Sequence, residues 1–200
     1  MDIQPGDQIL LPSFNFVSTA SAFLRAGAEL IFCEIDPETM NIDVRDVEKR
    51  ITDRSRAIVP VHYGGIGVNI SAIVNLAEQH NLLIIEDAAQ GLGAKIDGAW
   101  LGGIAPLGTI SFHETKNIHC GLGGALFIND PNWFKRAEDI WERGTNRAKM
   151  FKGLVDKYSW IEPGSSFYPS EFQAAFLLAQ LEAIDTNRIE REIIYNFYMQ

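Results

Sequence analysis

A lysine in a loop of small and polar residues is the first side chain in this 200-residue sequence that could do chemistry. Lys116 follows the apolar and hydroxyl residues of segment 109–112, and the glycine-rich segment 121–124 comes soon after it. Open α/β sheets bind ligands just beyond the ends of their strands. A lysine at such a place can form a Schiff base where desolvation or neighbouring cations favour its neutral amine. A lone loop lysine is more often a solvated surface charge, so a second feature is needed.

An acid at the end of another apolar run supplies that second feature. Asp87 follows Ile84, Ile85 and Glu86, and small residues come directly after it. In isolation such an acid is about as often a helix cap. Pyridoxal phosphate (PLP) needs a lysine for its aldehyde and an acid for its pyridinium nitrogen, both reaching one crevice from one sheet edge. Asp87 and Lys116 therefore predict a PLP site, with both side chains pointing into a shared crevice.

Short apolar runs predict the strands that position these residues. The runs alternate with amphipathic stretches, which is typical of βαβ units and an α/β fold with a mainly parallel sheet covered by helices. The expected strands are residues 8–11, 29–35, 57–61, 82–86, 109–112 and 125–128.

Helices are expected between the strands and after them. Asp43 and Ser71 are the predicted N-caps of helices 44–51 and 71–80, and Ile73 and Leu76 should face the sheet. Residues 145–169 are predicted to be an irregular loop, and the whole chain is predicted to be one domain. The remaining expected helices are residues 17–25, residues 131–143 with a stop at Gly144, and residues 170–200.

Composition excludes several classes of function. The formal charge of −9 disfavours binding to nucleic acid. No run of residues approaches the roughly 20 apolar positions of a membrane span, and the first residues do not form a secretory signal, so we expect no membrane partner and a cytoplasmic protein. Cys33 and Cys120 lack the spacing of a disulfide framework or a zinc site, so no metal is expected.

Two further segments extend the pattern around Asp87 and Lys116. They are residues 12–19 and residues 59–65. Together with residues 87–90 and 111–117, they resemble the signatures of the DegT/DnrJ/EryC1/StrS family of sugar aminotransferases. The resemblance spans nearly the whole chain and implies the large domain of a fold type I PLP-dependent transferase, incomplete here, with its mainly parallel sheet sandwiched by helices.

The resemblance also implies roles for individual residues. Lys116 would be the Schiff-base lysine, and Asp87 would keep the pyridine nitrogen protonated. The other implied cofactor-binding residues are Gln90 at the ring hydroxyl, Ser111 at the phosphate, Phe16 stacked on the ring, and His113. His62 and His80 are expected to be structural. Leu122, Cys120 and His119 depart from the residues usual in the family.

Segments 143–147, 155–160 and 164–166 narrow the resemblance to members that aminate TDP-4-keto-6-deoxyglucose. The implied partners are this nucleotide sugar and an amino-acid donor, with glutamate as the implied donor. A homodimer and a place in lipopolysaccharide or common-antigen biosynthesis are implied too.

Family members are about twice as long as this chain. The resemblance therefore implies that residues 1–200 are the central part of the large domain, without its N-terminal segment and without the C-terminal small domain. Two alternatives stay open: a catalytically inactive remnant or interaction module of the same fold, and a PLP-dependent sugar dehydratase. Lys116 argues against the dehydratase, because those relatives carry histidine at that position.

Overall fold

The computed structural model describes residues 2–200, and the chain divides into two compact units. The first unit comprises Met1–Phe112 and Gly124–Asn129, and the second comprises His113–Gly123 and Asp130–Gln200. The expectation of a single central piece of one large domain stays a prediction. No helix within residues 2–200 is long and apolar enough to cross a membrane.

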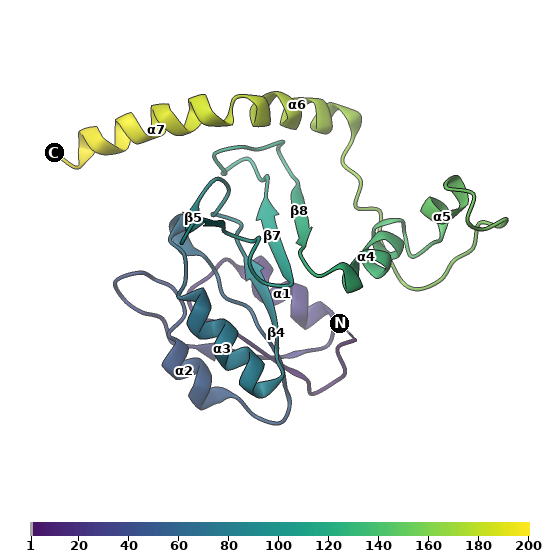
Figure 1. The fold of residues 1–200 in the computed structure, drawn as a ribbon, viewed down its shortest axis with the longest axis horizontal. Coiled ribbons are helices and arrows are strands. Elements are labelled where there is room, and N and C mark those ends of the chain that lie inside the picture. The colour runs from purple at the N-terminus through teal and green to yellow at the C-terminus, as the bar shows by residue number, and fades with distance from the viewer. Residues whose placement is uncertain (1) are drawn as a thin grey trace. The chain divides into compact units, whose positions relative to one another are not determined.

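A six-stranded sheet with strand order β2-β1-β3-β4-β7-β8 forms the centre of the first unit (Figure 1). The first five of these strands run parallel to their neighbours, and β8 pairs antiparallel with β7. The six predicted strands and the α/β class are confirmed, with ends that differ by a few residues. The strands are β1 (Gln8–Pro12), β2 (Glu29–Cys33), β3 (Ser55–Ile58), β4 (Leu83–Asp87), β7 (Leu107–Ser111) and β8 (Gly124–Ile128).

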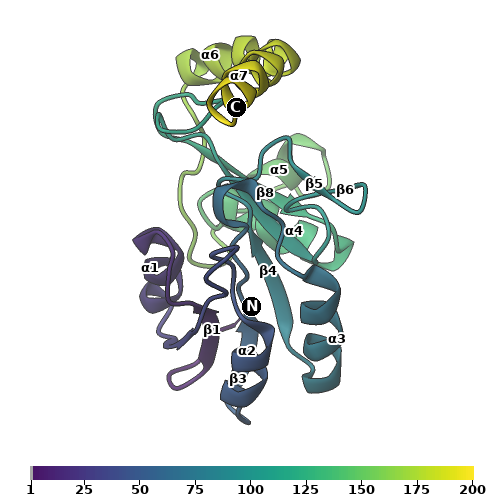
Figure 2. The same cartoon turned by 90° about the vertical axis from the view of Figure 1, so that its left-hand side faces the viewer.

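Helices cover both faces of this sheet. On one face, Val47 of α2 (Val44–Arg50) and Ile73 and Leu76 of α3 (Ile70–His80) pack into a buried cluster with strand residues such as Ile58. On the other face, Phe23 of α1 (Val17–Arg25) packs against β1 and β3. Figure 2 shows α1 and α2 on opposite sides of β1. The alternation along each buried strand thus divides the core into two apolar layers.

The predicted cap of α3 is wrong. The helix begins at Ile70, and the side chain of Asn69 accepts a hydrogen bond from the backbone N–H of Ala72 at 3.2 Å. Ser71 therefore lies inside the first turn. Both residues are good caps by type, but Asn69 holds the N-cap position, directly before the first helical residue. The predicted cap of α2 is confirmed, because the Asp43 side chain accepts from the N–H of Arg45.

A short antiparallel hairpin lies between β4 and β7 and was not predicted. It consists of β5 (Lys95–Ile96) and β6 (Ala99–Trp100). The two turn residues, Asp97 and Gly98, have φ angles of +50° and +82°. An Asp-Gly pair is the usual sequence of such a two-residue turn, so the signal was present in the sequence.

Two predicted helices of the second unit are each interrupted. In place of one helix over residues 131–143, a 3-10 turn (Pro131–Trp133) precedes α4 (Phe134–Trp141). In place of one helix over residues 170–200, α6 (Glu171–Glu182) and α7 (Ile184–Tyr198) flank Ala183. Ser170 does open α6 as the first residue of a capping box with Gln173. The stretch expected to be irregular contains one short helix, α5 (Arg147–Phe151).

Candidate active site

The carboxyl ends of the parallel strands gather several of the predicted site residues within the first unit. Asp87 is the last residue of β4, and Ser111 is the last residue of β7, its parallel neighbour. Phe16 lies beyond the end of β1, at the N-cap of α1. Because parallel strands end at the same edge of a sheet, these three residues share the edge at which open α/β sheets bind ligands.

Two hydrogen bonds hold the carboxylate of Asp87, which is half-buried. The hydroxyl of Thr19 donates to Oδ2 at 2.6 Å, and the backbone N–H of Ala89 donates to Oδ1 at 3.0 Å. The backbone of Asp87 is held as well, since its N–H donates to the carbonyl of Pro60 and its carbonyl accepts from His62. The carboxylate is therefore fixed in direction, and each of its oxygens can still accept another hydrogen bond.

Gln90 is held by the turn that follows β3. The backbone N–H of Gly64 donates to Oε1 of Gln90 at 2.9 Å. Gly64 and its neighbour Gly65 have φ angles of +61° and +80°, in the left-handed region that favours glycine. Because the backbone donor must meet the amide oxygen, the Nε2 group of Gln90 remains as a donor for a ligand.

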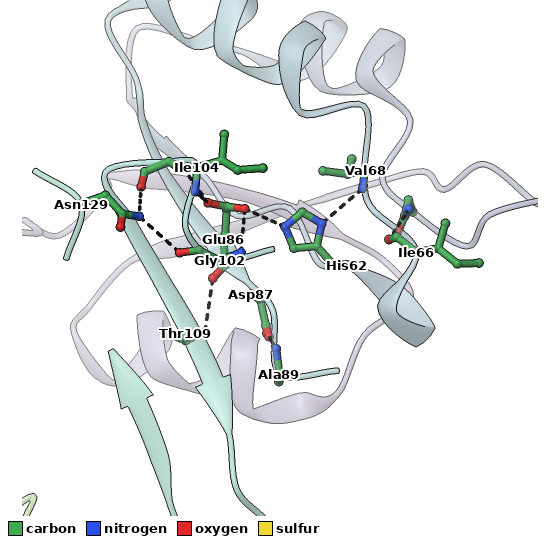
Figure 3. A network of polar contacts seen from close by, with 12 residues as sticks. His62, Ile66, Val68, Glu86, Asp87, Ala89, Gly102, Ile104, Thr109 and Asn129 are labelled. Carbon is green, nitrogen blue, oxygen red and sulfur yellow. Dashed lines mark hydrogen bonds and ion pairs between the residues drawn. The ribbon is translucent and has the colours of Figure 1, made fainter. Parts of the chain in front are cut away.

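A fully buried pair, His62 and Glu86, lies next to Asp87 (Figure 3). The two side chains are 2.9 Å apart, between Nε2 and Oε2. The N–H of Val68 donates to Nδ1 of His62, which places the ring proton on Nε2, facing Glu86. The carboxylate also accepts from the backbone N–H groups of the loop after β6, at Gly102, Ile104 and Ala105.

Burial acts to raise the pKa of Glu86, but the hydrogen bonds from His62 and from Ala105, Gly102 and Ile104 outweigh it. The net result is a pKa below the ordinary glutamate value. Glu86 thus joins the end of β4 to the turn after β3 and to the loop before β7. The structural role expected for His62 is confirmed, and His80 ends α3 as expected.

Phe16 is not part of the core. Its side chain is 71% exposed, although aromatic residues are usually buried. An exposed ring at this edge of the sheet is free to cover the face of a planar ligand. Ser111 is half-buried at the end of β7.

Lys116 and His113 belong to the second unit, in the segment that follows β7. The Lys116 backbone N–H donates to the carbonyl of His113 at 2.8 Å, and Nδ1 of His113 accepts from the N–H of Thr115 at 3.2 Å. The N–H of Glu114 donates to the carbonyl of Gly121 at 2.7 Å. These bonds close the loop around Lys116. The expectation that Asp87 and Lys116 share one crevice stays a prediction.

The amine of Lys116, a half-buried residue, has no hydrogen bond or ion pair within the part of the chain that the structure describes. The same segment is tied to α6, because Nε2 of Gln173 donates to the carbonyl of Leu122 at 2.8 Å. His119, which departs from the family pattern, packs its ring against Phe176 with centroids 5.5 Å apart. Lys116 is thus a lysine on a locally ordered loop.

Sequence reasoning missed two contributors to this site. Thr19 carries no signal, because its contact with Asp87 joins residues 68 positions apart. Glu86 did carry a signal, since a carboxylate inside an apolar strand must find partners when it is buried. The partner, His62, lies 24 positions earlier.

Comparison with known proteins places this arrangement in context. The family model described as "DegT/DnrJ/EryC1/StrS aminotransferase family" matches residues 1–200. The chain is 33% identical over 200 residues to GDP-perosamine synthase of Caulobacter vibrioides, covering 100% of this chain and 52% of that protein. It is 36% identical over 184 residues to a pleiotropic regulatory protein of Geobacillus stearothermophilus, covering 92% of this chain and 47% of that protein.

Solved structures agree with the fold. The crystal structure of DesV from S. venezuelae, in complex with a ketimine intermediate, matches with a TM-score of 0.83 and 34% sequence identity. The match covers 92% of this chain and 47% of that chain. The chain therefore spans about half the length of the relatives that it matches.

Proposed function

The chain belongs to the DegT/DnrJ/EryC1/StrS aminotransferase family, and from that premise we propose that its residues form the cofactor-binding centre of a PLP-dependent aminotransferase. The observation that carries the proposal is the carboxylate of Asp87, held at the end of β4 by Thr19 and Ala89. That carboxylate can accept a hydrogen bond from a protonated ring nitrogen. The residues around it fit the cofactor, because they offer an exposed aromatic ring in Phe16 and an amide donor in Gln90.

When bound, PLP supplies a cationic ring that accepts the electron pair left when a proton leaves the carbon bearing the amino group. Asp87 would hold the proton on the ring nitrogen, and the Nε2 group of Gln90 would donate to the ring oxygen. Ser111 would donate its hydroxyl to the phosphate. The amine of Lys116 would hold the cofactor covalently at rest and, once released, take the proton from the substrate carbon and return it.

Two other residues complete the proposed site. Phe16 would stack on the ring and limit the access of water to it. His113 is included with Lys116 because the carbonyl of His113 accepts from the Lys116 backbone, so the two residues share one turn of the loop. The proposed site residues are therefore Lys116 and Asp87 for catalysis, with Gln90, Ser111, Phe16 and His113 for the cofactor.

The proposed substrate is a nucleotide-linked 4-keto-6-deoxy sugar, TDP-4-keto-6-deoxyglucose, with glutamate as the amino donor. The support for a nucleotide-linked sugar is the resemblance of segments 143–147, 155–160 and 164–166, together with the similarity to GDP-perosamine synthase. The comparison with GDP-perosamine synthase makes a GDP-linked sugar the competing choice. Saturation-transfer NMR with the TDP-linked and a GDP-linked keto sugar in competition distinguishes them, and stronger transfer to the GDP-linked sugar would reject the proposed substrate.

We also propose that the protein works as a homodimer in the cytoplasm, in the biosynthesis of a surface polysaccharide. Support for self-association comes from α6 and α7, where large apolar side chains are exposed. Examples are Phe172, which is 90% exposed, and Phe197, which is 72% exposed. Monomeric soluble proteins rarely expose large apolar patches, whereas surfaces that bind another protein often do.

Visible absorbance tests the proposed cofactor chemistry. The 200-residue chain in excess PLP should develop a band that free PLP lacks. The variant Lys116→Ala should remove most of this band, and Asp87→Ala should weaken it less, because one residue forms the covalent bond and the other stabilises the ring charge. Lys95→Ala is the matched control, since Lys95 lies over Trp100 on the hairpin and should not matter. An unchanged band in Lys116→Ala would reject the proposal.

A further inference from the structure

The short hydrogen bond between Thr19 and Asp87 joins two separate elements. Thr19 lies in the first turn of α1, Asp87 ends β4, and the hydroxyl oxygen is 2.6 Å from Oδ2. We infer that Thr19 is a positioning residue, whose hydroxyl fixes the Asp87 carboxylate in the orientation that meets the ring nitrogen of the cofactor. This inference rests on the proposed function.

Fixing an aspartate carboxylate requires more than one donor. The last torsion of an aspartate side chain has a broad, two-fold preference, so a single hydrogen bond leaves the carboxylate free to rotate about that bond. The N–H of Ala89 holds Oδ1, and it comes from the strand's own continuation two residues away. Thr19 holds the other oxygen from a different element. Two donors on two oxygens therefore define the plane of the carboxylate.

Threonine suits this task better than a flexible donor. Its branched Cβ restricts the first side-chain torsion, so the hydroxyl direction follows the helix backbone. A threonine in a helix commonly turns its hydroxyl back to a carbonyl one turn earlier. In this structure the hydroxyl donates to Asp87 instead. Thr19 and Asp87 are both half-buried, which limits competition from water for this bond.

The same turn also presents Phe16. The backbone N–H of Thr19 donates to the carbonyl of Phe16 at 3.2 Å. The first turn of α1 therefore places the exposed ring of Phe16 and the donor for Asp87 on one short stretch of backbone. A shift of this turn would move the stacking ring and the support of the acid together.

The test compares four variants, Asp87→Asn among them, in which the cofactor is first fixed by borohydride reduction, which leaves a stable pyridoxyl group on lysine. Thr19→Val keeps the shape of threonine and removes the donor, whereas Thr19→Ser keeps the donor. Thr52→Val is the matched control, because the Thr52 hydroxyl donates to Oε1 of Gln8, also at 2.6 Å and in the same unit. The readout is the proton affinity of the ring nitrogen, followed by absorbance against pH.

We expect Thr19→Val to lower the proton affinity of the ring nitrogen about tenfold, the effect of losing one hydrogen bond to a charged group. Thr19→Ser and Thr52→Val should stay within about twofold of the unmodified chain. Asp87→Asn should lower the affinity further than Thr19→Val. If Asp87→Asn lowers it and Thr19→Val matches Thr52→Val, the positioning role is overturned and the proposed function stands.

A chain that carries no pyridoxyl group on Lys116, or in which Asp87→Asn has no effect, contradicts the proposed function instead. A double-mutant cycle of unfolding without cofactor then decides the role of Thr19. Thr19→Val and Asp87→Asn should be non-additive if the hydroxyl holds the carboxylate. Additive effects would overturn the inference.

Discussion

Glu86 has more hydrogen-bond donors around it than any other carboxylate described above. Oε1 accepts from the N–H groups of Ile104 and Ala105, and Oε2 accepts from His62 and from the N–H of Gly102. Both oxygens are therefore needed as acceptors. The side chain immediately before Asp87 therefore holds the end of β4 to the turn after β3 and to the loop before β7.

The substitution Glu86→Gln tests this arrangement. Either orientation of the amide would turn an NH₂ group toward two donors, at a fully buried position. The unfolding free energy at pH 7 should fall by about 2–4 kcal/mol. Urea denaturation measures it, and Glu78→Gln on the exposed side of α3 is the control. An equally small loss in both variants would contradict the role of Glu86.

The difference in unfolding free energy between the unmodified chain and Glu86→Gln should depend on pH. Because the pKa of Glu86 is lower in the folded protein than its ordinary value, the ionised side chain stabilises the fold at pH values above that ordinary value. This contribution is lost as the pH falls through the lower, folded-state pKa. The difference between the unmodified chain and Glu86→Gln should therefore be full at pH 7 and shrink below about pH 4.3.

For single residues, the sequence predicts the place of a residue within its strand better than it predicts the hydrogen-bond partners of the side chain. Asp87 and Ser111 could be assigned to strand ends because apolar runs stop at or next to them. Thr19 could not be assigned to Asp87, since no local pattern encodes a contact between α1 and β4. The orientation of Gln90 likewise depends on a glycine of another turn, Gly64.

Among the helices, α3 begins at a different residue from the one expected from the sequence. Asn69 caps the helix through its side chain, and Ser71 does not. Asn69→Ala should lower the unfolding free energy by about 1 kcal/mol, because the first turn loses a partner for its N–H groups. Ser71→Ala should change it by less than about 0.5 kcal/mol. Chemical denaturation of both variants checks this, and a larger loss in Ser71→Ala would restore the original expectation.

The strands were predictable because each contains a short apolar run that is bounded by polar or turn-forming residues. Buried parallel strands such as β1 and β4 contain continuous apolar runs, at residues 9–11 and 83–85. The breaks near Ala183 and after Trp133 were not, because neither glycine nor an interior proline marks them. The β5–β6 hairpin was not predicted either, although its Asp-Gly turn is a signal that could have been recognised.

At the scale of the whole molecule, the chain spans about half the length of its curated relatives. A polypeptide of these 200 residues should therefore bind PLP weakly and show no measurable amino transfer. Much of a phosphate's hold in such enzymes comes from backbone N–H groups at a helix N-terminus. We therefore expect the half of the relatives that residues 1–200 do not match to contribute to that hold.

The assay supplies TDP-4-keto-6-deoxyglucose, glutamate and PLP, and follows amino-sugar formation by mass spectrometry. Turnover by this polypeptide at a rate typical of enzymes, about 1 per second or more, would show that residues 1–200 suffice. It would also remove the inactive-remnant alternative. We expect no turnover, together with the visible absorbance band that depends on Lys116.

We propose that Lys116 is the lysine that binds the cofactor, in partnership with Asp87. Peptide mass spectrometry after borohydride reduction of the chain in PLP tests it most directly, because it identifies the modified lysine. We predict that the pyridoxyl group accumulates on Lys116 ahead of every other lysine, and that Asp87→Ala reduces this preference. Equal labelling of Lys116 and exposed lysines such as Lys95, or labelling that Asp87→Ala leaves unchanged, would contradict the account.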